Sequence, residues 1–412
     1  MNRSISVIAG LGLLLAGGLL AGGLAAEPLP FTGVNLAGGE FYGPKPDVRP
    51  IYGKNFIYPG VAEYAYFAWH GANVFRLCFH WETIQPQANG ELDAEMLGHL
   101  KTAVKLATDK GLVVLLDPHN YARYYGKVLG TPEAPAAIFA DFWTKLAGVF
   151  RDDPHVWFGL VNEPNGLSAA AWFDIANEAV AAIRKAGATN LILLPGTAYS
   201  GAHSWQSDWY GGANAASVAK VKDPIDHLAI EVHQYLDGDS SGSKPEIKSP
   251  TIGSERLKGF VQWCRANKYR AFLGEFGVPG NEAGKVALED MLTAMERDSD
   301  VWLGWTWWAA GAWWPKDYMF TIQPSGGDKP QMKWLIPHLR GRQTPTVKLT
   351  IDGAQPTAVP CGQTAPVKAP AAPAGKTFAR WSGDVAFLAD ATKAETTLTV
   401  PYRDVSLTVE WR

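Results

Sequence analysis

The chain has 412 residues, of which 47% are hydrophobic and 19% charged, so it can bury a large core and exceeds the usual size of one domain. Its formal net charge of −3 gives no broad field that would attract nucleic acid or anionic lipid, so we expect a neutral partner. The 17 tryptophans are unusually many, and indole rings beyond the needs of a core often line surfaces that pack against flat apolar faces.

The first 26 residues have the pattern of a secretory signal peptide. Met1–Arg3 supply a short positive region, Ile5–Leu24 are apolar, and small residues precede the end of the segment at Ala26. An uncleaved membrane anchor is the alternative, but the many glycines make this stretch a poor helix. We therefore expect a secreted protein, extracellular or periplasmic, with no membrane association after cleavage.

Three cysteines follow this segment, namely Cys78, Cys264 and Cys361, so at most one internal bridge is possible. This number excludes a fold that is held together by disulfides. Each thiol is expected to be a buried small group rather than a nucleophile.

Between residues 27 and 341, short apolar runs alternate with amphipathic stretches. Eight runs predict strands, at Phe31–Leu36, Asn73–Phe79, Leu112–Pro118, Val156–Asn162, Asn190–Pro195, His227–Val232, Arg270–Gly274 and Val301–Trp307. The stretches between them predict helices, among them Asp93–Asp109, Ala136–Phe150, Ser168–Lys185, Ser254–Asn267, Asn281–Arg297 and Gln331–Arg340. Eight βα units in series indicate a closed (β/α)₈ TIM barrel, because no Gly-x-Gly-x-x-Gly turn follows any strand as an open doubly wound sheet would require.

Polar and aromatic residues gather where the predicted strands end. Barrel enzymes build their sites at the C-terminal ends of the strands. The residues in these places are Arg76, His119, Asn162, Glu163, His233, Tyr235, Glu275 and Trp308. Together they predict a polar mouth with an aromatic rim and two acids.

The two acids, Glu163 and Glu275, end the fourth and seventh predicted strands, which lie nearly across the barrel. Glycoside cleavage needs such a pair, because one acid protonates the leaving oxygen while the other meets the positive charge at the anomeric carbon. A separation of about 5 Å suits a nucleophile and an acid/base in a retaining enzyme. An ion-paired surface glutamate is the plain alternative for Glu163 alone, but the matching place of Glu275 argues against it.

These residues resemble the pattern of glycoside hydrolase family 5, the cellulase family. The strings Asp117–Tyr124, Val232–Asp237 and Trp307–Gly311 look like the endo-β-1,4-glucanases of filamentous fungi and some bacteria, and the resemblance spans about residues 30–340. It implies that Glu163 is the acid/base and Glu275 the nucleophile, an assignment that spacing alone leaves open. It also implies a β-glucan polysaccharide as substrate.

The remaining site residues receive expected roles from chemistry and from this resemblance. Arg76 should donate to Glu275 and keep it ionised, because a nearby cation lowers the pKa of a carboxyl group. Asn162 should bind the sugar 2-hydroxyl, and His119 other sugar hydroxyls. His233 is expected near Glu163, the hydroxyl of Tyr235 should reach Glu275, and Trp308 should form the platform under the sugar that is cleaved.

A metal site is the competing interpretation of His119 and His233, since histidines at strand ends can bind zinc. No His-x-His follows the first strand and no third ligand is evident, so we expect neither a metal nor another cofactor. Among the other tryptophans, Trp305 and Trp307 alternate along the last strand and can equally belong to the core. Four more, predicted in loops above the mouth, can extend the cleft or pack locally: Trp205, Trp209, Trp313 and Trp314.

Residues 342–412 differ in character from the barrel. Pro and Ala clusters separate alternating segments such as Val347–Ile351 and Thr396–Val400, which predict strands. The segment Phe378–Asp384, followed by Val405–Trp411, resembles the small all-β repeat modules of bacterial secreted and surface proteins. We expect a small C-terminal all-β module in which Trp381 belongs to the core, and its role as spacer, surface anchor or substrate-binding unit stays open.

The sequence therefore predicts a secreted, monomeric, retaining endo-β-1,4-glucanase that hydrolyses cellulose or soluble β-glucans. Mannanase, xyloglucanase and licheninase activities share the same site chemistry, and loop shape decides between them. A carbohydrate-binding barrel that has lost turnover is the alternative from another class. The intact pair of Glu163 and Glu275 argues against it.

Overall fold

The structure is a computed structural model that describes residues 27–341, 346–360, 364–400 and 404–412. The predicted signal peptide and Cys361 lie outside these ranges. Cys78 and Cys264 are buried free thiols, as predicted. Within the described ranges, no helix combines the length and the apolar character that a bilayer span requires.

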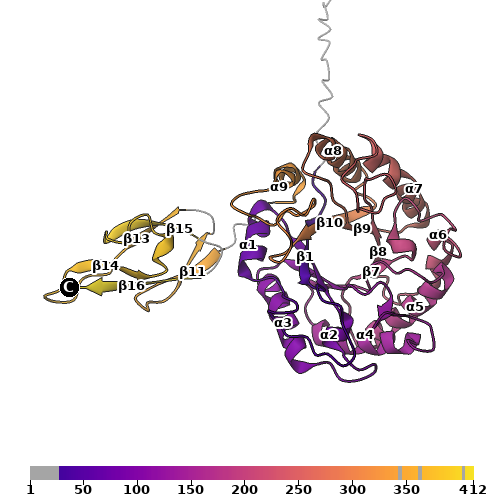
Figure 1. Cartoon of the computed structure of the whole chain (residues 1–412), viewed down its shortest axis with the longest axis horizontal. Coiled ribbons are helices and arrows are strands. Elements are labelled where there is room, and N and C mark those ends of the chain that lie inside the picture. Colours follow the sequence, from indigo (N-terminus) through magenta and orange to yellow (C-terminus); the bar gives the residue numbers. More distant parts are fainter. Residues whose placement is uncertain (1–26, 342–345, 361–363, 401–403) are drawn as a thin grey trace, which may run out of the picture.

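In the described chain, eight parallel strands close into a barrel in the order β1-β10-β9-β8-β7-β6-β3-β2 (Figure 1). They are β1 (Phe31–Gly39), β2 (Val74–Phe79), β3 (Val113–Pro118), β6 (Val156–Gly159), β7 (Ile192–Pro195), β8 (Leu228–His233), β9 (Ala271–Glu275) and β10 (Trp302–Ala310). Every predicted barrel strand is present, and the predicted (β/α)₈ fold is confirmed. The fourth strand is shorter than expected, because β6 ends at Gly159 and the chain leaves the sheet before Asn162.

Helices surround the strands as an outer ring (Figure 1). They are α1 (Val61–His70), α2 (Trp81–Ile84), α3 (Ala94–Thr108), α4 (Ala136–Phe150), α5 (Ala169–Lys185), α6 (Asn214–Ser217), α7 (Ile252–Asn267), α8 (Glu282–Arg297) and α9 (Pro330–Leu335). Short 3₁₀ turns (η1, Ala198–Ser200; η2, Val218–Lys220; η3, Ile336–His338) and a small hairpin (β4, Arg123–Tyr124; β5, Lys127–Val128) lie in the connections. Side chains of Asp93, Ser168 and Asn281 cap α3, α5 and α8 by accepting backbone N–H bonds, which explains why these helices begin where the sequence predicts.

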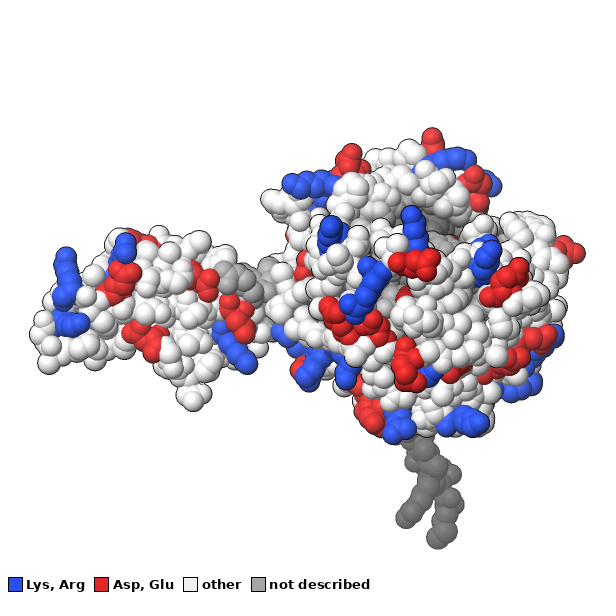
Figure 2. All heavy atoms as spheres, turned by 60° about the horizontal axis from the view of Figure 1, so that its bottom comes forward, with Lys and Arg blue, Asp and Glu red and all other residues white. Residues whose placement is uncertain are grey.

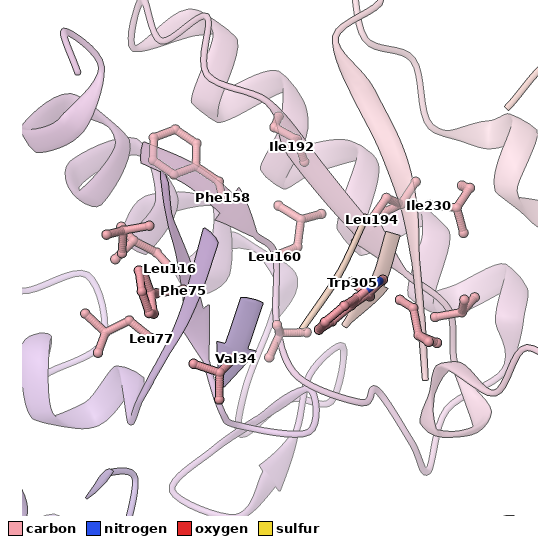
Figure 3. Close-up of a cluster of buried hydrophobic side chains, with 14 of the residues drawn as sticks. Val34, Phe75, Leu77, Leu116, Phe158, Leu160, Ile192, Leu194, Ile230 and Trp305 are labelled. Carbon is pink, nitrogen blue, oxygen red and sulfur yellow. The ribbon is translucent and has the colours of Figure 1, made fainter. Parts of the chain in front are cut away.

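Alternate side chains of the strands face two different cores. Outward residues such as Phe75 and Leu116 pack under the helices (Figure 3). Inward residues form a separate apolar floor inside the barrel, made of Val74, Val113, Leu115, Trp157, Leu191, Leu193, Ala229 and Phe272. One period-2 step further along their strands, Arg76, Asp117 and Glu231 therefore share the space above this floor.

The C-terminal module has a separate hydrophobic core, to which Ala65 of α1 also contributes. In its described residues β12 (Thr357–Pro360), β11 (Thr346–Ile351), β16 (Val405–Trp411) and β14 (Phe378–Gly383) form one sheet in that order, and β13 (Thr364–Lys368) pairs with β15 (Glu395–Thr399). Trp381 is only 2% exposed and lies in this core, as predicted. On the face shown in Figure 2, acidic and basic side chains are interspersed over barrel and module, in keeping with the small net charge.

Candidate active site

The C-terminal ends of the strands bring all eight predicted site residues into one connected group. Arg76 contacts Glu275 and Asn162, and Asn162 contacts His119. The ring of His119 stacks on Trp308 at 5.4 Å between centroids. The remaining contacts join His233 to Glu163 and, at 3.6 Å, to Glu275, which also accepts from Tyr235.

The two glutamates approach each other closely. A carboxylate oxygen of Glu163, a ring nitrogen of His233 and a carboxylate oxygen of Glu275 all lie within 4.8 Å of one another. This spacing is far from the range of about 6.5–9.5 Å that leaves room for a water between two carboxyl groups. The geometry therefore suits direct attack by one carboxylate on a sugar while the other handles the proton.

Arg76 is the centre of the site and is only 1% exposed. Its guanidinium donates from Nε to Glu231 and from Nη1 to Asn35 and Glu275, each at 2.9 Å, and from Nη2 to Asn162 at 2.8 Å. Nη1 also lies 2.9 Å from Asp117. Because the planar fork reaches several strands at once, it fixes the positions of the groups around it.

Glu275 ends β9 and is held ionised by its neighbours. Its Oε1 accepts from Arg76 and its Oε2 accepts from the hydroxyl of Tyr235 at 2.9 Å. Burial alone would raise the pKa of Glu275, but the positive charges of His233 and Arg76 outweigh burial and bring the pKa below its usual value. This carboxylate is therefore ready to act as a nucleophile.

Glu163 lies after the end of β6 in strained backbone. Its φ of +41° falls in the left-handed region, which is uncommon for a residue other than glycine and costs on the order of 1–3 kcal/mol. Three hydrogen bonds hold this turn, from Asn162 N–H to Pro118 O, from Tyr199 N–H to Pro164 O, and from the Asn165 amide to Glu163 O. The strain turns the carboxyl group into the mouth, where 16% of the side chain is exposed.

The pKa of Glu163 is raised, in contrast to that of Glu275. Burial raises it, and the hydrogen bond from His233 Nδ1 at 2.8 Å offsets burial only in part. His233 itself is surrounded by acids. Although burial disfavours its charged form, Glu275, Glu163 and Glu231 raise its pKa to about 10, so the ring is an imidazolium at neutral pH.

His119 and Asn162 form an ordered pair. Nδ1 of His119 lies 2.7 Å from Asp117 Oδ2, and Nε2 lies 3.1 Å from Nδ2 of Asn162. The amide oxygen of Asn162 faces Arg76, so its N–H points at His119, and Nε2 must accept. The pKa of His119 is raised, because the carboxylate of Asp117 outweighs the effect of burial. The amide N–H of Asn162 at Nε2 acts against this shift, since only the neutral ring can accept there.

The tryptophans divide into platform, core and rim. Trp308 is partly exposed, and its Nε1–H donates to the hydroxyl of Tyr318 at 3.1 Å. Trp305 and Trp307 are buried, at 1% and 0% exposure, and belong to the core. Trp205, which we considered for the cleft, is also fully buried against Phe173, Phe260 and Trp263, so that interpretation is wrong for this residue.

A cavity of about 570 Å³ opens directly beside the acid pair. Its lining includes Glu163, His233, Tyr199, Trp209, Tyr210 and Asp239. Trp209 is 65% exposed, as suits a ring that meets a ligand rather than the core. The volume of this cavity is typical of ligand-binding clefts. Two larger hollows contain none of the site residues: one of about 770 Å³ lies on the outside of the barrel along α3, and one of about 630 Å³ lies between α1 and α3 of the barrel and residues of the C-terminal module.

Within the part of the chain that the structure describes, two clusters have a composition that can bind a metal ion: Cys78 with Asp117 and His119, and Glu163 with His233 and Glu275. In the first, Asp117 Oδ2 already contacts both His119 and Arg76, and the guanidinium would repel a cation. In the second, the charged ring of His233 has no lone pair to offer. The residues present therefore fit hydrogen-bond chemistry better than metal chemistry.

Several residues of the site escaped the sequence analysis. Asn35 donates its amide to the carbonyls of Gly274, Thr306 and Trp307 and accepts from Arg76, and Asp117 and Glu231 complete the surroundings of the guanidinium. Each is a polar residue within a mostly apolar strand. Such residues are rarely fully buried unless paired, so this isolation was a usable signal.

Comparison with known proteins agrees with this geometry. Residues 52–311 match the family model described as cellulase (glycosyl hydrolase family 5). This chain belongs to glycosyl hydrolase family 5. It is therefore a glycoside hydrolase, and the family resemblance noted in its sequence is confirmed. Residues 343–412 match a second model, the divergent InlB B-repeat domain.

The relatives of this family 5 enzyme include fungal and bacterial proteins. It is 35% identical over 320 residues to the probable endo-beta-1,4-glucanase B of Aspergillus oryzae, covering 76% of this chain and 92% of the relative. The structure of XacCel5A in complex with cellopentaose shares 51% identity with a TM-score of 0.73, covering 75% and 99% of the two chains. The endo-beta-1,4-glucanase Xac0029 of Xanthomonas axonopodis pv. citri shares 47% identity with a TM-score of 0.73, covering 76% and 99%.

Proposed function

We propose that this enzyme hydrolyses internal β-1,4-glucosidic bonds of cellulose or soluble β-glucans with retention of configuration. Glu275 is the nucleophile and Glu163 the acid/base. The observation that carries the proposal is the close approach of two carboxyl groups whose pKa values are displaced in opposite directions. Environments that separate the pKa values of two acids in this way support the assignment of one as proton donor and the other as anion.

In the first step, Oε2 or Oε1 of Glu275 attacks the anomeric carbon as Glu163 protonates the departing glycosidic oxygen. The C–O bond to the leaving sugar breaks and an ester bond to Glu275 forms. In the second step, Glu163, now a carboxylate, takes a proton from water, and the hydroxide oxygen displaces Glu275 from the anomeric carbon. Two inversions return the original configuration, and both acids recover their starting states.

The other side chains bind and orient the sugar. The partly exposed face of Trp308 offers an apolar surface to a pyranose ring, and Asn162 retains one amide N–H for the 2-hydroxyl while the other faces His119. The names of the relatives support a β-1,4-glucan as substrate, as does the cellopentaose bound to XacCel5A. Mannan, xyloglucan and mixed-linkage glucan remain the competing substrates for this chain.

A polysaccharide panel tests the substrate and the roles together. Wild type should release reducing sugar fastest from carboxymethylcellulose, and more slowly from mannan, xyloglucan and barley mixed-linkage β-glucan, and ¹H NMR should show the β-anomer first. Glu275→Gln should abolish turnover of every substrate. Glu163→Gln should lower turnover of polysaccharide by about 10²–10⁴-fold but still release 2,4-dinitrophenol from an activated β-cellobioside, whose leaving group needs no acid.

Glu296→Gln, which changes another buried glutamate away from the mouth, is the matched control and should keep normal turnover. Initial formation of the α-anomer would contradict retention. Full polysaccharide turnover by Glu163→Gln would remove its role as acid.

We also propose that the enzyme is exported and acts as a monomer outside the cytoplasm. The support for export is the charge and hydropathy pattern of residues 1–26. N-terminal sequencing of the protein recovered from medium or periplasm should begin near Glu27. A protein that keeps residues 1–26 and stays with the membrane fraction would contradict this proposal.

A further inference from the structure

A carboxylate that the two-glutamate mechanism does not use lies directly behind His233. Glu231 is on β8, two residues before His233, and is 1% exposed. Its Oε1 accepts from Arg76 Nε at 2.9 Å and lies 3.6 Å from Nε2 of His233. Because a buried carboxylate is costly to desolvate, its contacts with these two cationic groups stabilise Glu231 in this position.

One glycine leaves the space that Glu231 occupies, and a second lies at van der Waals distance from its carboxylate. A Cβ atom on Gly274 of β9 would overlap Oε1 of Glu231 and would lie 2.9 Å from Nε2 of His233. A Cβ atom on Gly159 of β6 would lie 3.4 Å from Oε2 of Glu231. The neighbouring strand β9 therefore has a glycine where a side chain would collide with both this carboxylate and the imidazole.

His233 consequently has acids on both of its nitrogens. Nδ1 lies 2.8 Å from Glu163 Oε1 and 3.6 Å from Glu275 Oε2, while Nε2 faces Glu231. A neutral imidazole has one N–H and would turn a lone pair toward one of these carboxylates, whereas an imidazolium donates on both sides. Arg76 is the other cation beside these carboxylates, and it contacts Glu231 and Glu275 rather than the imidazole ring of His233.

We propose that Glu231 is a positioning residue that holds His233 as an imidazolium, with its Nδ1–H aimed at Glu163. The inference rests on the two-glutamate mechanism proposed above. When Glu163 gives up its proton to the leaving oxygen, the carboxylate that forms already faces a cation 2.8 Å away. His233 itself neither gains nor loses a proton in either step, and Glu231 does not touch the sugar.

Glu231→Gln tests this role because glutamine keeps the shape and an oxygen for Arg76 Nε but removes the charge. His233 should then become neutral within the working pH range, and Glu163 should hold its proton to higher pH. We expect the alkaline limb of kcat/KM to move up by about one pH unit, with kcat reduced and KM for soluble glucan unchanged. The lost charge of Glu231 acts in the opposite direction, but more weakly, because the ring of His233 lies between it and Glu163. The proposal is overturned if the alkaline limb of kcat/KM stays in place or moves to lower pH.

Asp223→Asn is the matched control. It removes the charge of another buried carboxylate, which pairs with Arg184 at 2.8 Å and is 1% exposed in its side chain, but which is not among the site residues. Asp223→Asn should lower the free energy of unfolding and leave the alkaline limb of kcat/KM in place. A shifted limb in this variant would show that lost stability alone moves the profile, and would overturn the inference.

A measurement on the unchanged protein keeps the idea testable if Glu231→Gln does not fold. In ¹⁵N-histidine-labelled wild type, the His233 signal, assigned by its loss in His233→Asn, should show both ring nitrogens protonated at pH 8. Titration of this signal near pH 6.5 overturns the proposal. Failure of the two-glutamate mechanism is distinguishable, because it would appear as initial release of the α-anomer by wild type or as full polysaccharide turnover by Glu163→Gln.

Discussion

Arg76→Lys keeps a positive charge in the barrel but removes the fork that joins several strands. In the described structure, Arg76 has five contacts, to Asn35, Asp117, Asn162, Glu231 and Glu275. An ammonium has three donors, so at least two contacts are lost. At about 1.5–3 kcal/mol for each hydrogen bond to a charged group, the free energy of unfolding should fall by about 3–6 kcal/mol.

The same change should move the acid limb of kcat/KM to higher pH. Against the effect of burial, His233 and Arg76 hold the pKa of Glu275 below its usual value, so a weaker contact with the cation raises that pKa. Because the nucleophile must be ionised, the limb should rise by about one pH unit. Urea unfolding and a pH profile on soluble glucan measure both effects.

Arg184→Lys is the control for this prediction. Arg184 is likewise buried and donates to Asp223 and to the carbonyls of Ala188, Asn190 and His227, none of which belongs to the site. Arg184→Lys should lower the free energy of unfolding by a similar amount and leave the acid limb of kcat/KM unchanged. The reasoning is refuted if the free energy of unfolding of Arg76→Lys lies within about 1 kcal/mol of that of wild type. It is also refuted if the acid limb of kcat/KM of this variant coincides with that of wild type.

Other changes separate ligand contacts from packing and from charge. Trp209→Ala should raise KM for cellopentaose roughly 2–10-fold without changing Tm, because the ring is exposed beside the acid pair; an unchanged KM would contradict this. Trp205→Ala should lower the free energy of unfolding in urea by about 3–5 kcal/mol, and a small loss would argue against its burial. Burial opposes the charged form of His338, but Glu296 and Glu289 raise its pKa, so its stabilising effect is complete below about pH 6.5 and is lost as pH rises through the raised pKa. The stability difference between wild type and His338→Gln should therefore shrink from about pH 6 to pH 9, and a constant difference would contradict this.

The barrel could be predicted because its strands are buried on both faces and so appear as continuous apolar runs. Helix α1 was not among the predicted helices, since six of its ten residues are buried and no polar stripe marks an outer face. The end of β6 was also misplaced. Leu160 and Val161 are as apolar as the strand before them, yet both lie beyond its last residue, Gly159.

The site residues at the strand ends could be predicted from the sequence. The contacts among the buried charged residues beneath them could not. The period-2 alternation places Arg76, Asp117 and Glu231 in one interior, but which inward residues touch depends on the register between strands. The tryptophans show the same limit. Trp205 and Trp209 are four residues apart in one loop, and Trp205 is buried because Phe260 and Trp263 of α7 pack on it, a contact between segments far apart in the sequence.

The distribution of charge around the two cations bears on which glutamate carries the proton. In the described chain, Arg76 contacts Asp117, Glu231 and Glu275, and His233 adds contacts to Glu231 and Glu275. Among the described residues, the carboxylate of Glu163 pairs with His233 alone and is the most exposed of these acids, so protonating it sacrifices the least electrostatic stabilisation. Two cations with three carboxylates then leave one net negative charge, which favours the positive charge that develops at the anomeric carbon. The arrangement thus supports Glu163 as the acid on grounds independent of family resemblance.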